Sequence, residues 1–123
     1  MIKAEILLLT AGKSSRMGQP KALLSIKGQP LISYQINRLK ELGLPITVVL
    51  GAYADAISKV VTSKEVRLVL NKDFEKGMGS SIAFGTNSIR NTNPEIDAIL
   101  VCAIDQPLVP LDHFENLLST ASK

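Results

Sequence analysis

The sequence predicts an α/β fold in which a mostly parallel sheet has helices on both faces. Short apolar segments alternate with amphipathic segments along the whole chain. The apolar segments lack the regular polar–apolar alternation of a half-exposed strand, so both faces of the sheet should be buried. The 123 residues fit one domain with a single modest core.

The elements follow from apolar spacing and turn residues. A first strand is predicted over residues 4–10, which are rich in leucine. A helix is predicted over 30–43, because Pro30 suits a first helical turn and Gly43, followed by Pro45, ends it. The further predicted elements are strands at 46–50, 66–70 and 98–104 and helices at 53–62, 79–90 and from about Leu111 onward.

The connections between these elements restrict the order of the strands. Right-handed crossovers favour the order 3-2-1-4, with the winding direction changing between the first and fourth strands. The fourth strand would then be an exposed edge, and long exposed edges invite pairing with another chain. We therefore expect either a partner chain, such as a second copy in a homo-oligomer, or a sequence (1–123) that is the amino-terminal part of a longer, truncated domain.

Composition and charge narrow the classes of function. A hydrophobic fraction of 46% and a charged fraction of 20% are typical of a soluble globular protein. The net charge of +3 fits either scattered surface lysines or a site for an anionic substrate. The chain has no run of Lys and Arg and few aromatic residues, which argues against nucleic-acid binding. No apolar segment approaches the ~20 residues that span a bilayer.

Cysteine and histidine are each present once. Cys102 lies in an apolar segment, which predicts a core residue in a reducing compartment, and no disulfide can form within the chain. A zinc site of His and Cys, or a Cys–His nucleophilic pair with His113, is excluded within one chain. The amino terminus lacks the layout of a signal peptide, so we expect a cytoplasmic protein.

The first predicted strand leads into a basic loop over residues 10–28. Ligands of open α/β sheets bind at the carboxyl ends of strands, and Gly12 allows the backbone to approach a ligand closely. The loop is not a Walker loop, because Gln19 follows Gly18 where lysine is required. It is not a dinucleotide fingerprint either, because Ser14 replaces the second glycine. We expect a third type of loop, long enough to wrap a nucleotide.

Arg16 and Lys21 are the main candidates for phosphate contacts in this loop. The planar guanidinium of arginine matches pairs of phosphate oxygens, and lysine supplies a point charge. Because Arg16 and Lys21 are five residues apart on a folded loop, their side chains can contact a polyphosphate from two sides. The alternative is a pair of solvated loop cations.

Asp105 follows the fourth predicted strand, at the predicted change of winding direction. A carboxylate there can hold Mg²⁺, which prefers oxygen ligands and substrate phosphates. The alternative is an aspartate in a turn before Pro107.

A third candidate segment, NKDFEKGMGSS, connects the third strand to a helix. Gly77 and Gly79 permit close backbone approach, and Ser80 or Ser81 can cap the helix. Free N–H groups at a helix start bind anions or the edge of a base. The alternative is a flexible loop with a good N-cap.

Together these motifs resemble the molybdenum-cofactor nucleotidyltransferases, which are nucleoside-triphosphate transferases with a three-layer, Rossmann-like (GT-A-like) fold. The motifs that carry the resemblance are LLLTAGKSSRMGQPKALL, GQPLI, VVLGAYAD, NKDFEKGMGSSI and IDQPLV. Ala11 and Pro20 resemble the cytidylyltransferase branch, since the guanylyltransferase branch typically has glycine and an acidic residue there. The resemblance implies transfer of CMP from CTP to a molybdopterin-type cofactor with release of pyrophosphate.

The resemblance also implies roles for individual residues. Arg16 and Lys21 would neutralise the triphosphate, and Asp105 would hold Mg²⁺. The implied nucleotide-binding residues are Thr10, Ala11, Gly12, Lys13, Ser14, Arg16, Lys21, Asn71, Gly77, Gly79, Ser80 and Ser81. Members of the family are considerably longer, and their remaining part supplies much of the acceptor pocket.

Two other functions remain open from the sequence. One is a nucleotide- or cofactor-binding accessory protein without turnover, for example one that serves a molybdoenzyme partner. The other is a cytidylyl-, guanylyl- or uridylyltransferase that acts on a different phosphate acceptor.

Overall fold

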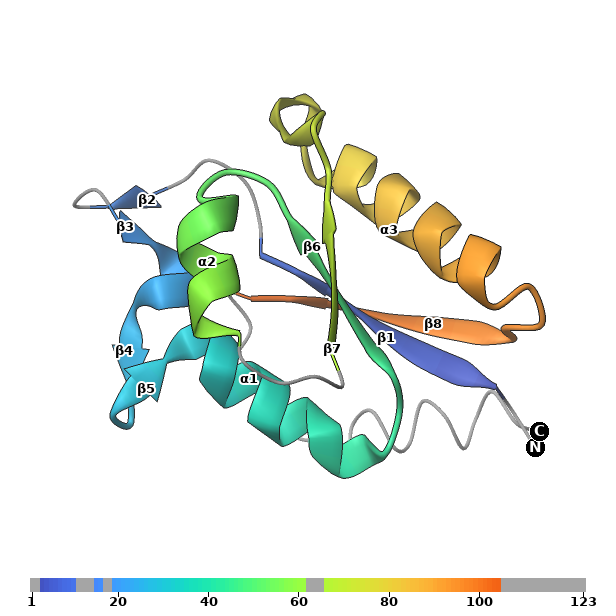
Figure 1. Cartoon of the computed structure of the whole chain (residues 1–123), viewed down its shortest axis with the longest axis horizontal. Coiled ribbons are helices and arrows are strands. Elements are labelled where there is room, and N and C mark those ends of the chain that lie inside the picture. The colour runs from blue at the N-terminus through green and yellow to red at the C-terminus, as the bar shows by residue number, and fades with distance from the viewer. Residues whose placement is uncertain (1–2, 11–14, 17–18, 62–65, 105–123) are drawn as a thin grey trace.

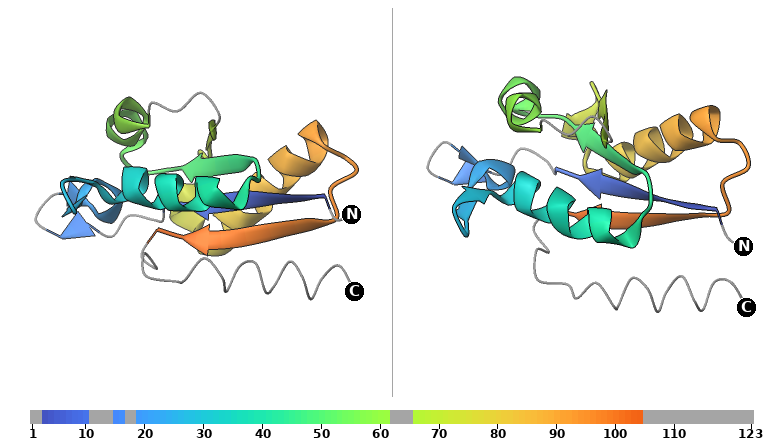
Figure 2. Two further views of the ribbon diagram at one scale, coloured as in Figure 1. Left: turned by 90° about the horizontal axis from the view of Figure 1, so that it is seen from below. Right: turned by 60° about the horizontal axis from the view of Figure 1, so that its bottom comes forward.

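A computed structural model describes residues 3–10, 15–16, 19–61 and 66–104, which form a parallel four-stranded sheet with helices on both faces (Figures 1 and 2). The strands are β1 (Ala4–Leu9), β6 (Ile46–Leu50), β7 (Val66–Leu70) and β8 (Ala98–Ala103). Their order is β7-β6-β1-β8, and every pairing is parallel. The predicted fold class and the predicted order 3-2-1-4 are both confirmed.

Strand β1 lies between β6 and β8 and contributes to two hydrophobic clusters. Ile6 and Leu8 point to the face that carries the first two helices, whereas Leu7 and Leu9 point to the opposite face. All four side chains are at most 1% exposed. This burial on both faces is why the four consecutive residues from Ile6 to Leu9 are all apolar rather than alternating with polar residues.

Helices α1 (Leu31–Leu39) and α2 (Ala54–Val60) cover one face of the sheet, and α3 (Met78–Thr92) covers the other (Figure 1). A 3₁₀ turn, η2 (Lys40–Leu42), extends α1 until Gly43 ends it in the left-handed region at φ 71°. These positions agree with the predicted helices to within a few residues. The helix predicted from about Leu111 lies outside the described residues.

Helix α3 lies against the sheet at Gly85. A Cβ atom at this position would come within 2.4 Å of Leu7 Cδ1 and 2.8 Å of Val49 Cγ2. The helix therefore needs a residue without a side chain here. At its far end, Arg67 of β7 donates hydrogen bonds to the hydroxyl groups of Ser88 and Thr92 on α3.

The segment between β1 and α1 differs from the single loop that the sequence predicts. It contains two short antiparallel pairs and a 3₁₀ turn: β2 (Ser15–Arg16) with β3 (Gln19–Pro20), η1 (Lys21–Leu23), and β4 (Ser25–Ile26) with β5 (Gln29–Pro30). Lys27 and Gly28 both have positive φ, 50° and 83°, as a two-residue hairpin turn requires. Strands of two residues are too short to produce a periodic pattern, so the sequence analysis missed them.

Strand β8 is one of the two edge strands of the described sheet, and its residue Val101 is 44% exposed. Within the described ranges, no helix has both the length and the apolar character that crossing a membrane requires.

Candidate functional site

The carboxyl ends of the four strands meet at one edge of the sheet, where hydrogen bonds connect them. The N–H of Ile104 donates to the carbonyl of Leu9 at 2.9 Å, which joins the end of β8 to the end of β1. The N–H of Asn71 donates to the carbonyl of Leu50 at 2.9 Å, which joins β7 to β6. The chain winds from β1 through β6 to β7 and then crosses to β8 on the other side of β1. The switch point therefore lies between β1 and β8, as predicted.

Thr10 holds the start of the basic loop against the sheet. Its side chain is 5% exposed, and its hydroxyl donates to the carbonyl of Val49 at 2.9 Å. The single hydroxyl proton is engaged in this bond. A ligand contact by Thr10 would therefore use an oxygen lone pair or the backbone.

Asn71 connects the end of β7 to the start of α3. Its side chain is 2% exposed, and its amide nitrogen donates to the hydroxyl oxygens of Ser80 at 3.2 Å and Ser81 at 3.1 Å. Its amide oxygen accepts the N–H of Asp73 at 3.0 Å. Asn71 is one of the nucleotide contacts that the resemblance implies. Its hydrogen-bond network was not predicted, because side-chain pairing across a turn leaves no sequence pattern.

The amino end of α3 has no side-chain cap. The N-cap is Gly77, with φ 105°, and no acidic residue lies in the first turn. The prediction that Ser80 or Ser81 caps the helix is wrong: Ser80 donates instead to the carbonyl of Asp73 at 3.2 Å. The first N–H groups of a 15-residue helix carry a partial positive charge, so this end of α3 favours an anion or a polar ligand edge.

The phosphate-loop candidates lie partly within the described backbone. Pairing of β2 with β3 sets Ser15 opposite Pro20 and Arg16 opposite Gln19. This hairpin brings the backbone at Arg16 close to the segment that continues into Lys21. Of the remaining predicted site residues, Ala11, Gly12, Lys13, Ser14 and Asp105 lie outside the described residues, as does His113.

Cys102 is a core residue, as predicted. Its side chain is 7% exposed, and burial raises the pKa of its thiol from 9.0 to about 11. The neutral thiol therefore predominates at neutral pH, and a thiolate nucleophile is not available there. The described residues contain no group of three or more His, Cys, Asp and Glu side chains that could hold a metal ion.

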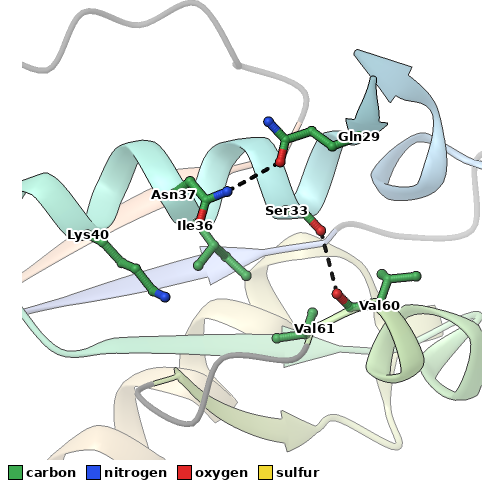
Figure 3. Close-up of a pocket in the computed structure, with 7 residues that line it drawn as sticks. All are labelled: Gln29, Ser33, Ile36, Asn37, Lys40, Val60 and Val61. Atoms are coloured by element: carbon green, nitrogen blue, oxygen red, sulfur yellow. Dashed lines mark hydrogen bonds between the residues drawn. The ribbon is translucent and has the colours of Figure 1, made fainter. Parts of the chain in front are cut away.

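A cavity of about 350 Å³ lies between α1 and the end of α2 (Figure 3). Its lining residues are Gln29, Ser33, Ile36, Asn37, Lys40, Val60 and Val61. Asn37 donates to the side-chain oxygen of Gln29 at 3.2 Å, and Ser33 donates to the carbonyl of Val60 at 3.5 Å. These bonds connect α1 to its neighbours, and none of the predicted nucleotide-binding residues lines the cavity.

A parallel sheet with a switch point and an uncapped helix end at its carboxyl edge is the architecture in which open α/β proteins bind ligands. The model of the MobA-like NTP transferase domain family matches residues 6–123. The chain belongs to this family. The resemblance inferred from the motifs is thereby confirmed.

A curated relative matches most of this chain but only about half of its own length. The chain is 36% identical to the nicotine blue oxidoreductase of Paenarthrobacter nicotinovorans over 102 residues, which are 81% of this chain and 48% of that protein. The chain thus spans about half the length of this relative. Because the relative is named an oxidoreductase, family membership alone does not define the reaction.

Solved structures confirm the fold. Rv0371c from Mycobacterium tuberculosis H37Rv superposes with a TM-score of 0.83 at 22% identity, covering 96% of this chain and 60% of that one. A nucleotidyl transferase from Methanothermobacter thermautotroptrophicus superposes with a TM-score of 0.76 at 23% identity, covering 92% of this chain and 55% of that one. In both, the part that matches this chain is little more than half of the solved protein.

Proposed function

We propose that the chain forms the nucleotide-binding part of a nucleotidyltransferase that moves CMP from CTP to a molybdopterin-type cofactor in the cytoplasm. One observation carries the proposal. In this member of the MobA-like NTP transferase domain family, the ends of β1 and β8 meet at the switch point, where the N–H of Ile104 donates a hydrogen bond to the carbonyl of Leu9. The basic loop and Asp105 are the segments that continue from these two strand ends.

The triphosphate side of the proposed site combines the basic loop with Arg16 and Lys21. Residues Ala11, Gly12, Lys13 and Ser14 would cradle the phosphates with backbone N–H groups, while the two cations neutralise their charge. The β2–β3 hairpin supports this role, since it brings the backbone near both cations together.

The base and ribose side would be formed by the turn after β7 and the amino end of α3. Gly77, Gly79, Ser80 and Ser81 present backbone N–H groups and hydroxyls at this end. Asn71 would act chiefly by holding the segment in place, since its amide already bonds to both serines.

Mg²⁺ is the proposed metal, with Asp105 as its protein ligand. The donor set fits, because Mg²⁺ commonly takes one or two carboxylates and completes its shell with triphosphate oxygens and water. Rv0371c has also been solved in complex with manganese. When bound, the metal would neutralise charge on the triphosphate.

In the proposed reaction, a phosphate oxygen of the acceptor attacks the α-phosphorus of CTP. The bond from the α-phosphorus to the bridging oxygen breaks, and pyrophosphate leaves with the electron pair. No covalent intermediate with the protein is needed, in agreement with the buried, neutral thiol of Cys102. The contribution of the chain is to orient the triphosphate and stabilise charge through Arg16 and Lys21.

A second candidate is binding without turnover. It stays a candidate because family members do not share one reaction: the relative from Paenarthrobacter nicotinovorans is named an oxidoreductase.

Calorimetry and an activity assay separate the candidates. The chain is titrated with CTP, GTP and UTP in the presence of Mg²⁺, and pyrophosphate release is then measured with molybdopterin as acceptor. We expect CTP to bind most tightly and pyrophosphate to form. Binding of CTP without pyrophosphate release would favour the accessory role. Pyrophosphate release only with GTP or UTP, or only with another phosphate acceptor, would show that the proposed substrates are wrong. Absence of nucleotide binding would reject the proposal.

A further inference from the structure

Tyr53 has a backbone conformation that is rare for a bulky residue. It follows β6 by three positions and has φ 62° and ψ 26°, in the left-handed region. It is the N-cap of α2, where an extended backbone is usual, and its carbonyl accepts the N–H of Ile57 at 3.0 Å. A side chain in this region raises the free energy of the folded state, and such residues cluster at functional sites.

The turn geometry does not account for this conformation. Lys27 is the other non-glycine residue with positive φ in the described part of the chain, at 50°. There the two-residue turn with Gly28 between β4 and β5 requires positive φ at both positions. Tyr53 begins a helix rather than a hairpin, so the same requirement does not apply.

Tyr53 lies at the carboxyl edge of the sheet, among the segments of the proposed nucleotide site. A Cβ atom on Gly51 would come within 2.6 Å of Phe74 Cβ, so the backbone after β6 lies directly against η3 (Phe74–Lys76). This turn leads into the amino end of α3 (Figure 1). Tyr53 is also 40% exposed, so part of this residue is accessible to a ligand at this edge.

We propose that Tyr53 stacks its ring on the base of the bound nucleotide. The inference rests on the proposed function, because it requires a nucleoside triphosphate at the carboxyl edge. Stacking on an aromatic ring adds affinity for any base, since every base has a π-face. Tyr53 therefore strengthens binding of CTP, GTP and UTP to a similar degree and does not select among them.

The test compares a full nucleotide with its phosphate chain alone. The ligands are CTP and inorganic tripolyphosphate, each with Mg²⁺, titrated into the 123-residue chain by calorimetry. Tyr53→Asn and Tyr53→Gly remove the ring but accept a left-handed backbone, whereas Tyr53→Phe keeps the ring. Phe84→Asn is the matched control, because it removes an aromatic ring of similar exposure, 38%, from α3 at a position outside the proposed site.

We expect both ringless variants to weaken CTP binding about tenfold or more and to change tripolyphosphate binding less than about twofold. Tyr53→Phe and Phe84→Asn should retain the affinity of the original chain for both ligands. The urea midpoint of the ringless variants should be unchanged or higher, because the backbone strain is relieved.

Four results would overturn the inference. Unchanged CTP affinity in the ringless variants would remove the stacking role and leave the proposed function intact. An equal loss for CTP and tripolyphosphate, or a lower urea midpoint, would assign Tyr53 to the support of α2 instead. If the original chain bound no nucleoside triphosphate, the inference and the proposed function would fail together.

Discussion

Replacing Asn71 with alanine should destabilise the protein by disconnecting α3 from β7. The substitution removes three hydrogen bonds of a side chain that is 2% exposed: two donated to Ser80 and Ser81 and one accepted from Asp73. Each such bond contributes about 1 kcal/mol net, so we expect a loss of about 3 kcal/mol. For a domain of this size that loss corresponds to a fall in Tm of about 10 °C.

Urea unfolding followed by far-UV circular dichroism measures the effect of Asn71→Ala. Asn87→Ala is the matched control, since Asn87 is an exposed asparagine on the same helix, and its effect should stay within about 0.5 kcal/mol. A loss below about 1 kcal/mol for Asn71→Ala would refute the reasoning, because it would mean that the network adds little to the attachment of α3. CTP affinity should fall together with stability, since the same network positions the amino end of this helix.

Three further predictions concern the phosphate loop, the contact between helix and sheet, and the buried thiol. Arg16→Ala or Lys21→Ala should slow single-turnover pyrophosphate release by roughly 10²–10³-fold, and losses under about threefold would contradict the assignment. Gly85→Leu should cost about 1–3 kcal/mol in urea unfolding because its side chain has no space beneath α3, whereas Ala83→Leu on the exposed face should be nearly neutral. The unfolded Cys102 thiol loses its proton near its ordinary pKa of 9.0, whereas the folded thiol holds it to about 11. Stability should therefore fall from pH 9 to 11 more steeply in the original chain than in Cys102→Ala, and equal slopes would disprove the assigned burial.

The sheet was predictable because its strands are buried on both faces. Residues 6–9 are all apolar and residues 46–50 are apolar except for Thr47 for that reason, and the handedness of crossovers then placed the two strands in the correct order. The hairpins between Ser15 and Pro30 were not predictable in the same way. They are held by backbone pairing over two residues each, and the turn at Lys27 and Gly28 lacks the Asn-Gly pattern that usually marks such a turn.

The candidate site was predictable in its location but not in its internal bonds. The rule that ligands bind beyond the carboxyl ends of parallel strands pointed to the strand ends at Leu9, Leu70 and Ala103, which do lie at one edge of the sheet. The network of Asn71 and the conformation of Tyr53 could not be predicted. Both depend on tertiary contacts and dihedral angles that no local spacing encodes.

The pairing of β1 with β8 has a consequence for how the protein is made. Lys3 at the start of β1 bonds to Asp97, 94 positions later. During synthesis, β1 can join β6 long before the ribosome has produced β8, so the central strand keeps one side open until nearly the whole described chain has emerged. Because so large a loop closes late, we expect the pairing of β8 with β1 to be a slow step of folding, and the nascent chain to be most vulnerable to misassembly just before it.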